Sequence, residues 1–197
     1  AAFSPWALLD RQIRFTRIDI DTLALNPELL ALLQMTAAAM TTGTTGSHLD
    51  VRLQQARIAG LTWTTADGLQ LGPFTTTLDW QNGKRLDRIV IAQDDGQLQA
   101  LMRFADAGID IQVQANEWST PVLAPLHKPM QITQLQSQLR YADGPLHIVS
   151  AELAGPVGKL RLHGQLDWQN DWHFAGRLAG ERVDLPLLLS SFGQQSV

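Results

Sequence analysis

The stretch Gly108–Asn116, GIDIQVQAN, alternates apolar and polar side chains. Its apolar residues run at every second position from Ile109 to Ala115, and polar residues stand between them. Successive side chains of a β-strand point to opposite faces, so the pattern is typical of a strand with one dry and one wet face. The same period of two recurs in Phe74–Trp80, Leu98–Phe104, Leu160–Trp168 and Trp172–Leu178.

Turn signals separate these alternating runs. Asn82-Gly83 and Asp95-Gly96 are two of them, and others lie at 66–68, 106–108 and 142–144. Asn-Gly and Asp-Gly favour tight hairpins because both residues tolerate positive φ. We therefore predict a mainly β fold, an antiparallel meander of long strands that forms a curled sheet or an open β-groove or sandwich.

Two helices are expected beside the strands. Asn26-Pro27-Glu28 supplies an N-cap, a proline for the first turn and an acidic residue, so a helix over Asn26–Met40 is predicted to pack on the sheet. A second, short helix is predicted to follow Val183-Asp184 and to reach Ser191.

The first two predicted strands change phase midway. In the stretch from Ile13 to Leu25 the apolar positions shift after Phe15 and again after Ile20, and a similar shift follows Leu53. A phase change within one apolar run predicts a β-bulge or a bend of the strand.

The chain also shows internal similarity. Residues 77–126 and 138–187 each give four strands with matching turns, so we predict two repeat units within one strand-rich domain, 1–197. The pentapeptide LDWQN occurs at Leu78–Asn82 and at Leu166–Asn170, which are not equivalent places in the two units. We interpret it as a hairpin end, with Trp closing an apolar row and Gln-Asn turning the chain.

Composition excludes several function classes. A net charge of −4 with scattered Lys and Arg argues against nucleic acid as a partner. The absence of cysteine removes thiolate catalysis and Cys-based zinc sites, and the five histidines lack metal-ligand spacing. We predict no metal and no cofactor. The most apolar run, Leu29–Met40, is too short to span a bilayer.

Six aspartates are candidates for a pair of catalytic carboxylates. Paired carboxylates are the groups that glycoside hydrolysis requires. These aspartates instead fall in turns or on the polar faces of strands, which is their usual structural role. We therefore predict that the domain is not an enzyme. The six are Asp19, Asp21, Asp94, Asp95, Asp106 and Asp110.

The dry faces of the strands are the main functional signal. An antiparallel sheet with one apolar face must pack it against another layer or present it to a ligand. A filled core and an open trough for acyl chains are both compatible with the pattern. If the face is open, the candidate groove residues are Leu98, Met102, Phe104, Ile109, Ile111, Val113, Leu160 and Leu162.

The rhythm of strands and Gly-rich turns resembles a known family. Gln12–Leu25, Leu86–Phe104 and Gly158–Leu189 are similar to the AsmA/TamB group of bacterial envelope proteins, and VDLPLLL (Val183–Leu189) resembles the segment that closes a unit there. The resemblance implies a non-enzymatic periplasmic domain in lipid transport or outer-membrane assembly. It also implies an inner-membrane anchor preceding Ala1 in a longer protein, and no catalytic residues.

Two other readings stay open. A weaker resemblance, to protein N of type II secretion, implies a periplasmic scaffold for protein secretion that binds envelope proteins through an exposed sheet edge. A glycan-binding or hydrolytic domain would need a cleft that holds two aspartates and a tryptophan.

Overall fold

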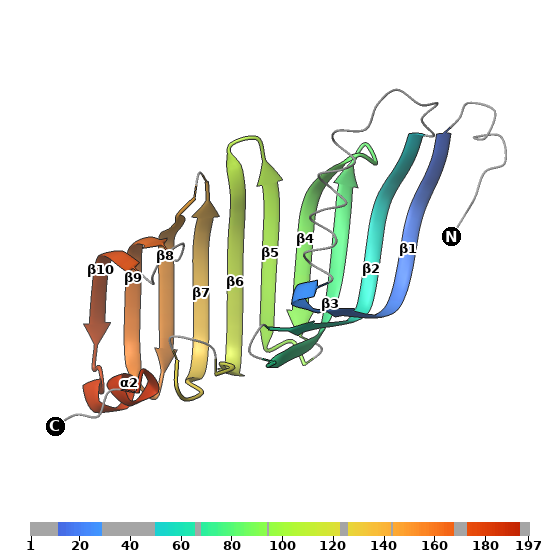
Figure 1. Ribbon diagram of the computed structural model, residues 1–197. Helices are drawn as coiled ribbons and strands as arrows, with labels where there is room; N and C mark the ends of the chain where they lie inside the picture. Colours follow the sequence, from blue (N-terminus) through green and yellow to red (C-terminus); the bar gives the residue numbers. More distant parts are fainter. Residues whose placement is uncertain are drawn as a thin grey trace. The chain divides into compact units, whose positions relative to one another are not determined.

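The chain is mainly β, as the alternating pattern predicted. The computed structural model describes residues 12–28, 50–65, 68–93, 95–122, 126–142, 144–167 and 173–193. Its strands are mostly antiparallel and are not closed into a barrel (Figure 1). The elements are β1 Gln12–Leu25, β2 Asp50–Thr64, β3 Gln70–Gln81, β4 Arg85–Gln93, β5 Leu98–Ala105, β6 Gly108–Ser119, β7 Gln131–Tyr141, β8 Leu146–Gly155, β9 Gly158–Asp167, β10 His173–Glu181 and α2 Leu185–Ser191.

Contacts divide the chain into two compact units. The first, Ala1–Asp94, contains β1 to β4, and the second, Asp95–Val197, contains β5 to β10 and α2. Within each unit the strands lie side by side in chain order. The predicted repeat 77–126 takes strands from both units, and the repeat and the single domain stay predictions.

The first pair of strands departs from the predicted meander. β1 and β2 run parallel, with Ile13 opposite Val51 and Ile20 opposite Ile58. Parallel neighbours need a crossover of a dozen or more residues, and the stretch between Leu25 and Asp50 is long enough for one. All other recorded pairs within the two units are antiparallel.

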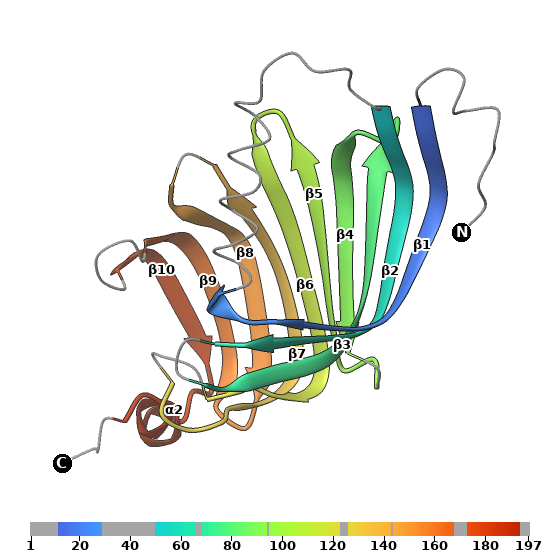
Figure 2. The ribbon, with the colours of Figure 1, turned by 45° about the vertical axis from the view of Figure 1, so that its right-hand side comes forward.

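Of the three predicted changes of phase, the one after Ile20 lies beside an irregular, bent part of the first unit, whereas the β1–β2 register is unchanged past Phe15 and Leu53. The pairing of β2 with β3 shifts register between Ile58 and Leu61 and again before Trp63. The neighbouring residues of β1, Ile20 and Leu23, are those at which its apolar pattern shifts. Figure 2 shows that β1 bends sharply along its length. Apolar side chains before and after the bend can therefore lie on the same face of the sheet.

The Asn-Gly turn has the predicted conformation. Asn82 and Gly83 both have positive φ, 53° and 72°. The Lys84 amide donates to the Gln81 carbonyl at 3.2 Å and closes the β3–β4 hairpin. Gln81 is still part of β3, so the prediction that Gln81 turns the chain was wrong by one residue.

The short C-terminal helix is confirmed. Asp184 caps α2, because its Oδ1 accepts a hydrogen bond of 2.9 Å from the Leu187 amide. The predicted helix over Asn26–Met40 lies almost wholly outside the described residues. Of that stretch only Asn26, Pro27 and Glu28 are described, and the latter two are helical.

Candidate functional site

The second unit carries a continuous apolar face across β5 to β10. Antiparallel pairing places every second residue of one strand opposite its counterpart in the next, so the apolar positions join into four rows of six. The first row is Phe104, Ile109, Tyr141, Leu146, Leu166 and Phe174; the second is Met102, Ile111, Leu139, Ile148, Gly164 and Gly176; the third is Ala100, Val113, Ser137, Ala151, Leu162 and Leu178; the fourth is Leu98, Ala115, Leu135, Leu153, Leu160 and Gly180.

All eight predicted groove residues lie in these rows. Of the eight, Leu160 alone is buried, and the other seven are half-buried. No large side chain in the described part of the chain is less than 2 % exposed. The described residues also place no second sheet over this face. The face is therefore partly accessible rather than the inner layer of a sandwich of described strands.

One end of the face, at the fourth row, is packed. We call it the closed end. Ala115, Val157 and Leu160 are buried there. The Asp184 amide, just before α2, donates to the Val157 carbonyl at 3.1 Å, and α2 lies at the ends of β8 to β10 (Figure 1). The amide of His127 adds a bond of 2.7 Å to the last helical carbonyl, that of Ser191.

The opposite end, at the first row, is the open end. None of its six side chains is buried, and Phe174 is 39 % exposed. Exposure is also high along β10, where Leu178 in the third row is 57 % exposed.

A glycine pair joins β9 and β10 within the second row. A Cβ at Gly176 would lie 2.7 Å from Gly164 Cα, so neither residue tolerates a side chain. The same Cβ would lie 2.8 Å from Phe174 Cζ, which shows that the Phe174 ring leans over Gly176. This aromatic cover replaces packing that the two glycines cannot supply.

Large and small side chains alternate from row to row. The second row presents Met102, Ile111, Leu139 and Ile148 on β5 to β8, whereas the third row presents mainly small residues on the same strands. Those are Ala100, Val113, Ser137 and Ala151. The sequence reading missed the contribution of β7, although Leu135, Leu139 and Tyr141 follow the same alternation.

The opposite face of the second unit is rich in amides. A hollow of about 300 Å³ lies on it, with four glutamines at its centre. Those are Gln112, Gln114, Gln136 and Gln138. Neither an aspartate nor a tryptophan lines this hollow, so it does not provide the cleft that a hydrolytic domain would need.

Three of the six candidate aspartates have contacts typical of turns and strand surfaces. Asp95 Oδ1 accepts from the Gln97 amide at 2.9 Å, as a turn-forming residue does. Asp19 pairs with Arg17 at 2.7 Å, and Asp110 lies 3.8 Å from Arg140. Asp94 lies outside the described residues.

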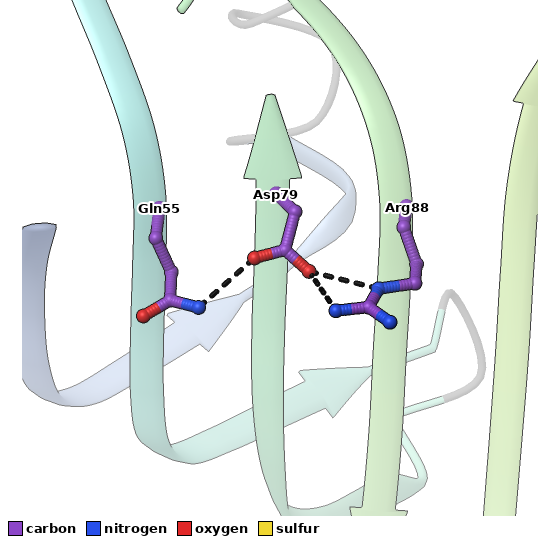
Figure 3. A network of polar contacts seen from close by, with 3 residues as sticks. All are labelled: Gln55, Asp79 and Arg88. Atoms are coloured by element: carbon purple, nitrogen blue, oxygen red, sulfur yellow. Dashed lines mark hydrogen bonds and ion pairs between the residues drawn. The ribbon is translucent and has the colours of Figure 1, made fainter. Parts of the chain in front are cut away.

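The first unit has a polar network across three strands of its wet face (Figure 3). Asp79 Oδ1 accepts from Gln55 Nε2 at 2.9 Å, and Oδ2 accepts from Nε and Nη2 of Arg88 at 2.9 and 2.6 Å. The hydrogen bond from Gln55, and then those from Arg88 and its charge, hold the pKa of Asp79 below its ordinary value, although partial burial acts the other way. Asp79 belongs to the first LDWQN, which thus ties β2, β3 and β4 together. In the second copy, Trp168 to Asn170 lie outside the described residues.

Within the described ranges, no set of three or more His, Asp or Glu residues is placed so that it could hold a metal ion. Of the histidines, His163 Nδ1 lies 2.9 Å from the Val149 carbonyl. His48 is outside the described residues.

Comparison with known proteins gives no match: no family model fits the chain, and no curated protein or solved structure is significantly similar to it. In the part of the chain that the structure describes, no helix has both the length and the apolar character needed to cross a membrane.

Proposed function

We propose that the apolar face of β5 to β10 binds lipid acyl chains, and that the protein acts without catalysis in envelope lipid transport or outer-membrane assembly. The observation that carries the proposal is the set of four aligned rows whose side chains remain half-exposed at seven of the eight predicted positions. Contiguous exposed apolar surface usually marks a binding site. The resemblance to the AsmA/TamB group supports a periplasmic location and an inner-membrane anchor in a longer protein.

The dimensions of the rows suit one acyl chain. Six strands at about 4.8 Å spacing span roughly 24 Å. A leaflet's share of a bilayer core is about 15 Å, half of the roughly 30 Å total. A chain laid across the strands would therefore find apolar contact along its whole length. We place it over the third row, because Ala100, Ser137 and Ala151 leave room between the larger side chains of the neighbouring rows.

The energy of such binding would come from burial of methylenes. Each buried CH₂ contributes about 0.8 kcal/mol, so ten would give about 8 kcal/mol before the costs of association are subtracted. No charged partner is needed for this term, which is consistent with the absence of Lys, Arg, Asp and Glu from the four rows.

A blocked row tests the proposal. Ser137→Phe would fill the third row, whereas Gln138→Phe adds the same ring to the opposite face of β7 as a matched control. We expect Ser137→Phe to weaken binding of a fluorescent fatty acid about tenfold, and the control to change it less than about twofold, because only the first removes apolar contact area.

Native mass spectrometry of the chain extracted from a bacterial envelope would show the bound species directly. Equal binding by the two variants, or recovery without any lipid, would contradict the proposal.

A second candidate function is favoured by β10. It is the last strand of the second unit, all nine of its residues are exposed, and it pairs with β9 without any register shift. A long regular edge strand is a template for an added strand. This observation supports the alternative of a periplasmic assembly module, related in role to protein N of type II secretion. A stoichiometric protein that slows hydrogen exchange of the β10 amides, in the absence of lipid, would favour it over lipid binding.

A further inference from the structure

A hollow of about 370 Å³ lies in the first unit, at the start of β1 and β2 and beside the β3–β4 turn. Arg14 on β1 and Arg52 on β2 both line it, and they are direct partners in the parallel pairing. Like charges directly opposite on neighbouring strands are unfavourable. Two arginine side chains that line one hollow can offer several N–H donors to an anion.

Three other lining side chains also have hydrogen-bond donors, beside the apolar Phe15. Thr16 contributes a hydroxyl, and Gln54 and Asn82 contribute carboxamides. None of the described residues that line the hollow has a carboxylate, and the two arginines bring a formal charge of +2 to it. Lys84, the next residue after the turn, is exposed.

The turn is held closely against Arg52. The Leu53 amide donates to the Gly83 carbonyl at 3.0 Å, and a Cβ at Gly83 would lie 2.7 Å from Arg52 Cβ. Glycine is therefore required for the turn to approach β2 and complete the hollow. Asn82 and Gly83 both have positive φ, as a tight hairpin turn requires. This turn conformation places Asn82 at the hollow.

We propose that this hollow binds a phosphate group, either free or as the ester headgroup of a lipid. Guanidinium groups recognise phosphate oxygens through paired N–H donors, which explains the use of two arginines rather than lysines. Arg14 and Arg52 also take part in other interactions within the chain, so an arriving phosphate shares donors with them. The inference does not depend on the proposed function, because its residues belong to β1, β2 and the β3–β4 turn rather than to the apolar face.

Titration of the full chain with inorganic phosphate, followed by NMR, tests the free anion. A second titration uses monomeric dihexanoyl phosphatidic acid, with dihexanoylglycerol as its phosphate-free counterpart. Arg14→Gln/Arg52→Gln should weaken phosphate binding at least about tenfold. The matched control, Arg17→Gln/Arg57→Gln, removes the same charge from the same two strands outside the hollow. It should change affinity less than about twofold, because only general attraction is lost.

Each outcome decides the proposal. Binding of phosphate, or of the phosphatidic acid alone, that depends on Arg14 and Arg52 supports it, and the second case identifies a lipid headgroup as the source. Equal losses in the two double variants, or equal binding of the phosphate-free lipid, would overturn it, as would the absence of any binding. Arg14→Lys/Arg52→Lys keeps the charge and serves if the glutamine variant does not fold. It should still bind more weakly, because the guanidinium fork is lost. Ser137→Phe should leave phosphate binding unchanged, so failure here is distinguishable from failure of acyl-chain binding.

Discussion

Both units bury apolar side chains, such as Ala56 and Ile58 in the first unit, but they differ in their polar contacts. In the first unit a hydrogen-bonded carboxylate, Asp79, links Gln55 and Arg88 on the wet face of three adjacent strands. In the second unit Ala115, Val157 and Leu160 are buried at the closed end, where α2 is docked by backbone hydrogen bonds, and Ile148 is buried in the second row. The wet face of the second unit has ion pairs as well, but these are solvent-exposed, such as Arg161 with Glu152 at 3.4 Å.

This difference bears on how each unit responds to pH and salt. A charged network depends on pH and salt, whereas apolar packing depends on neither to first order. The second unit buries Ala115 and Leu160 in the fourth row and Ile148 in the second row, and the rest of its apolar face is half-buried or exposed. Three substitutions test this comparison, from the largest expected effect to the smallest.

Leu160→Ala should have the largest effect. Leu160 is 7 % exposed at the closed end, so its truncation removes buried contacts and should lower the free energy of unfolding by about 2–4 kcal/mol. Leu178→Ala, the same change in a side chain that is 57 % exposed, should cost less than about 0.5 kcal/mol. Urea unfolding monitored in the second unit measures both. Similar losses would mean that the burial of Leu160 contributes no more to stability than the exposed contacts of Leu178.

Asp184→Ala should have an intermediate effect. It removes the hydrogen bond to the Leu187 amide that caps α2, at a cost of about 1 kcal/mol. Hydrogen exchange should accelerate in α2 and around Val157, whose carbonyl accepts a hydrogen bond from the Asp184 amide. Asp184→Asn retains a capping oxygen and should behave almost as the unchanged protein. A loss of the same size in both variants would show that the charge, not the cap, holds the helix.

Asp79→Asn should have the smallest effect, and one that depends on pH. Because the pKa of Asp79 is lower in the folded state than its ordinary value of 3.8, the ionised carboxylate stabilises the fold above that value. This contribution is lost as the pH falls through the folded-state pKa. The variant should therefore lose less stability than the unchanged protein between pH 6 and strongly acid solution, by under about 1 kcal/mol. Urea midpoints at several pH values measure the difference, and Asp87→Asn, at an exposed position of β4, is the control. Identical pH profiles for all three proteins would rule out a role for the network.

The alternating pattern alone predicted much of the fold. It found the apolar rows through three of the six strands of the second unit. Alternation at period two identified the strands, and Asn82-Gly83 identified a turn whose φ values match. The candidate face was found through β5, β6 and β9 because at least two successive face positions of each strand are apolar. The parallel pairing of β1 with β2 was missed, because it depends on how a long connection crosses over and not on the strands themselves.

The sequence alone did not predict the polar contacts between strands, for a related reason. Asp79 meets Arg88 only in a register that shifts by one residue before Trp80, and nothing local to either strand encodes that shift. Arg14 and Arg52 are likewise brought together only by the parallel pairing. Contacts of this kind depend on the register between neighbouring strands. The alternating pattern of a single strand does not determine that register.

The four rows have a consequence for how such a protein can change size. Each strand of the second unit contributes one residue to every row, so one more hairpin would lengthen all four rows by about 10 Å. No new motif is needed for this, only another alternating pair of strands with a glycine turn. The number of hairpins therefore sets the length of the apolar face. If the face binds acyl chains as proposed, duplication of a hairpin would match it to a longer chain while the end closed by α2 stays the same.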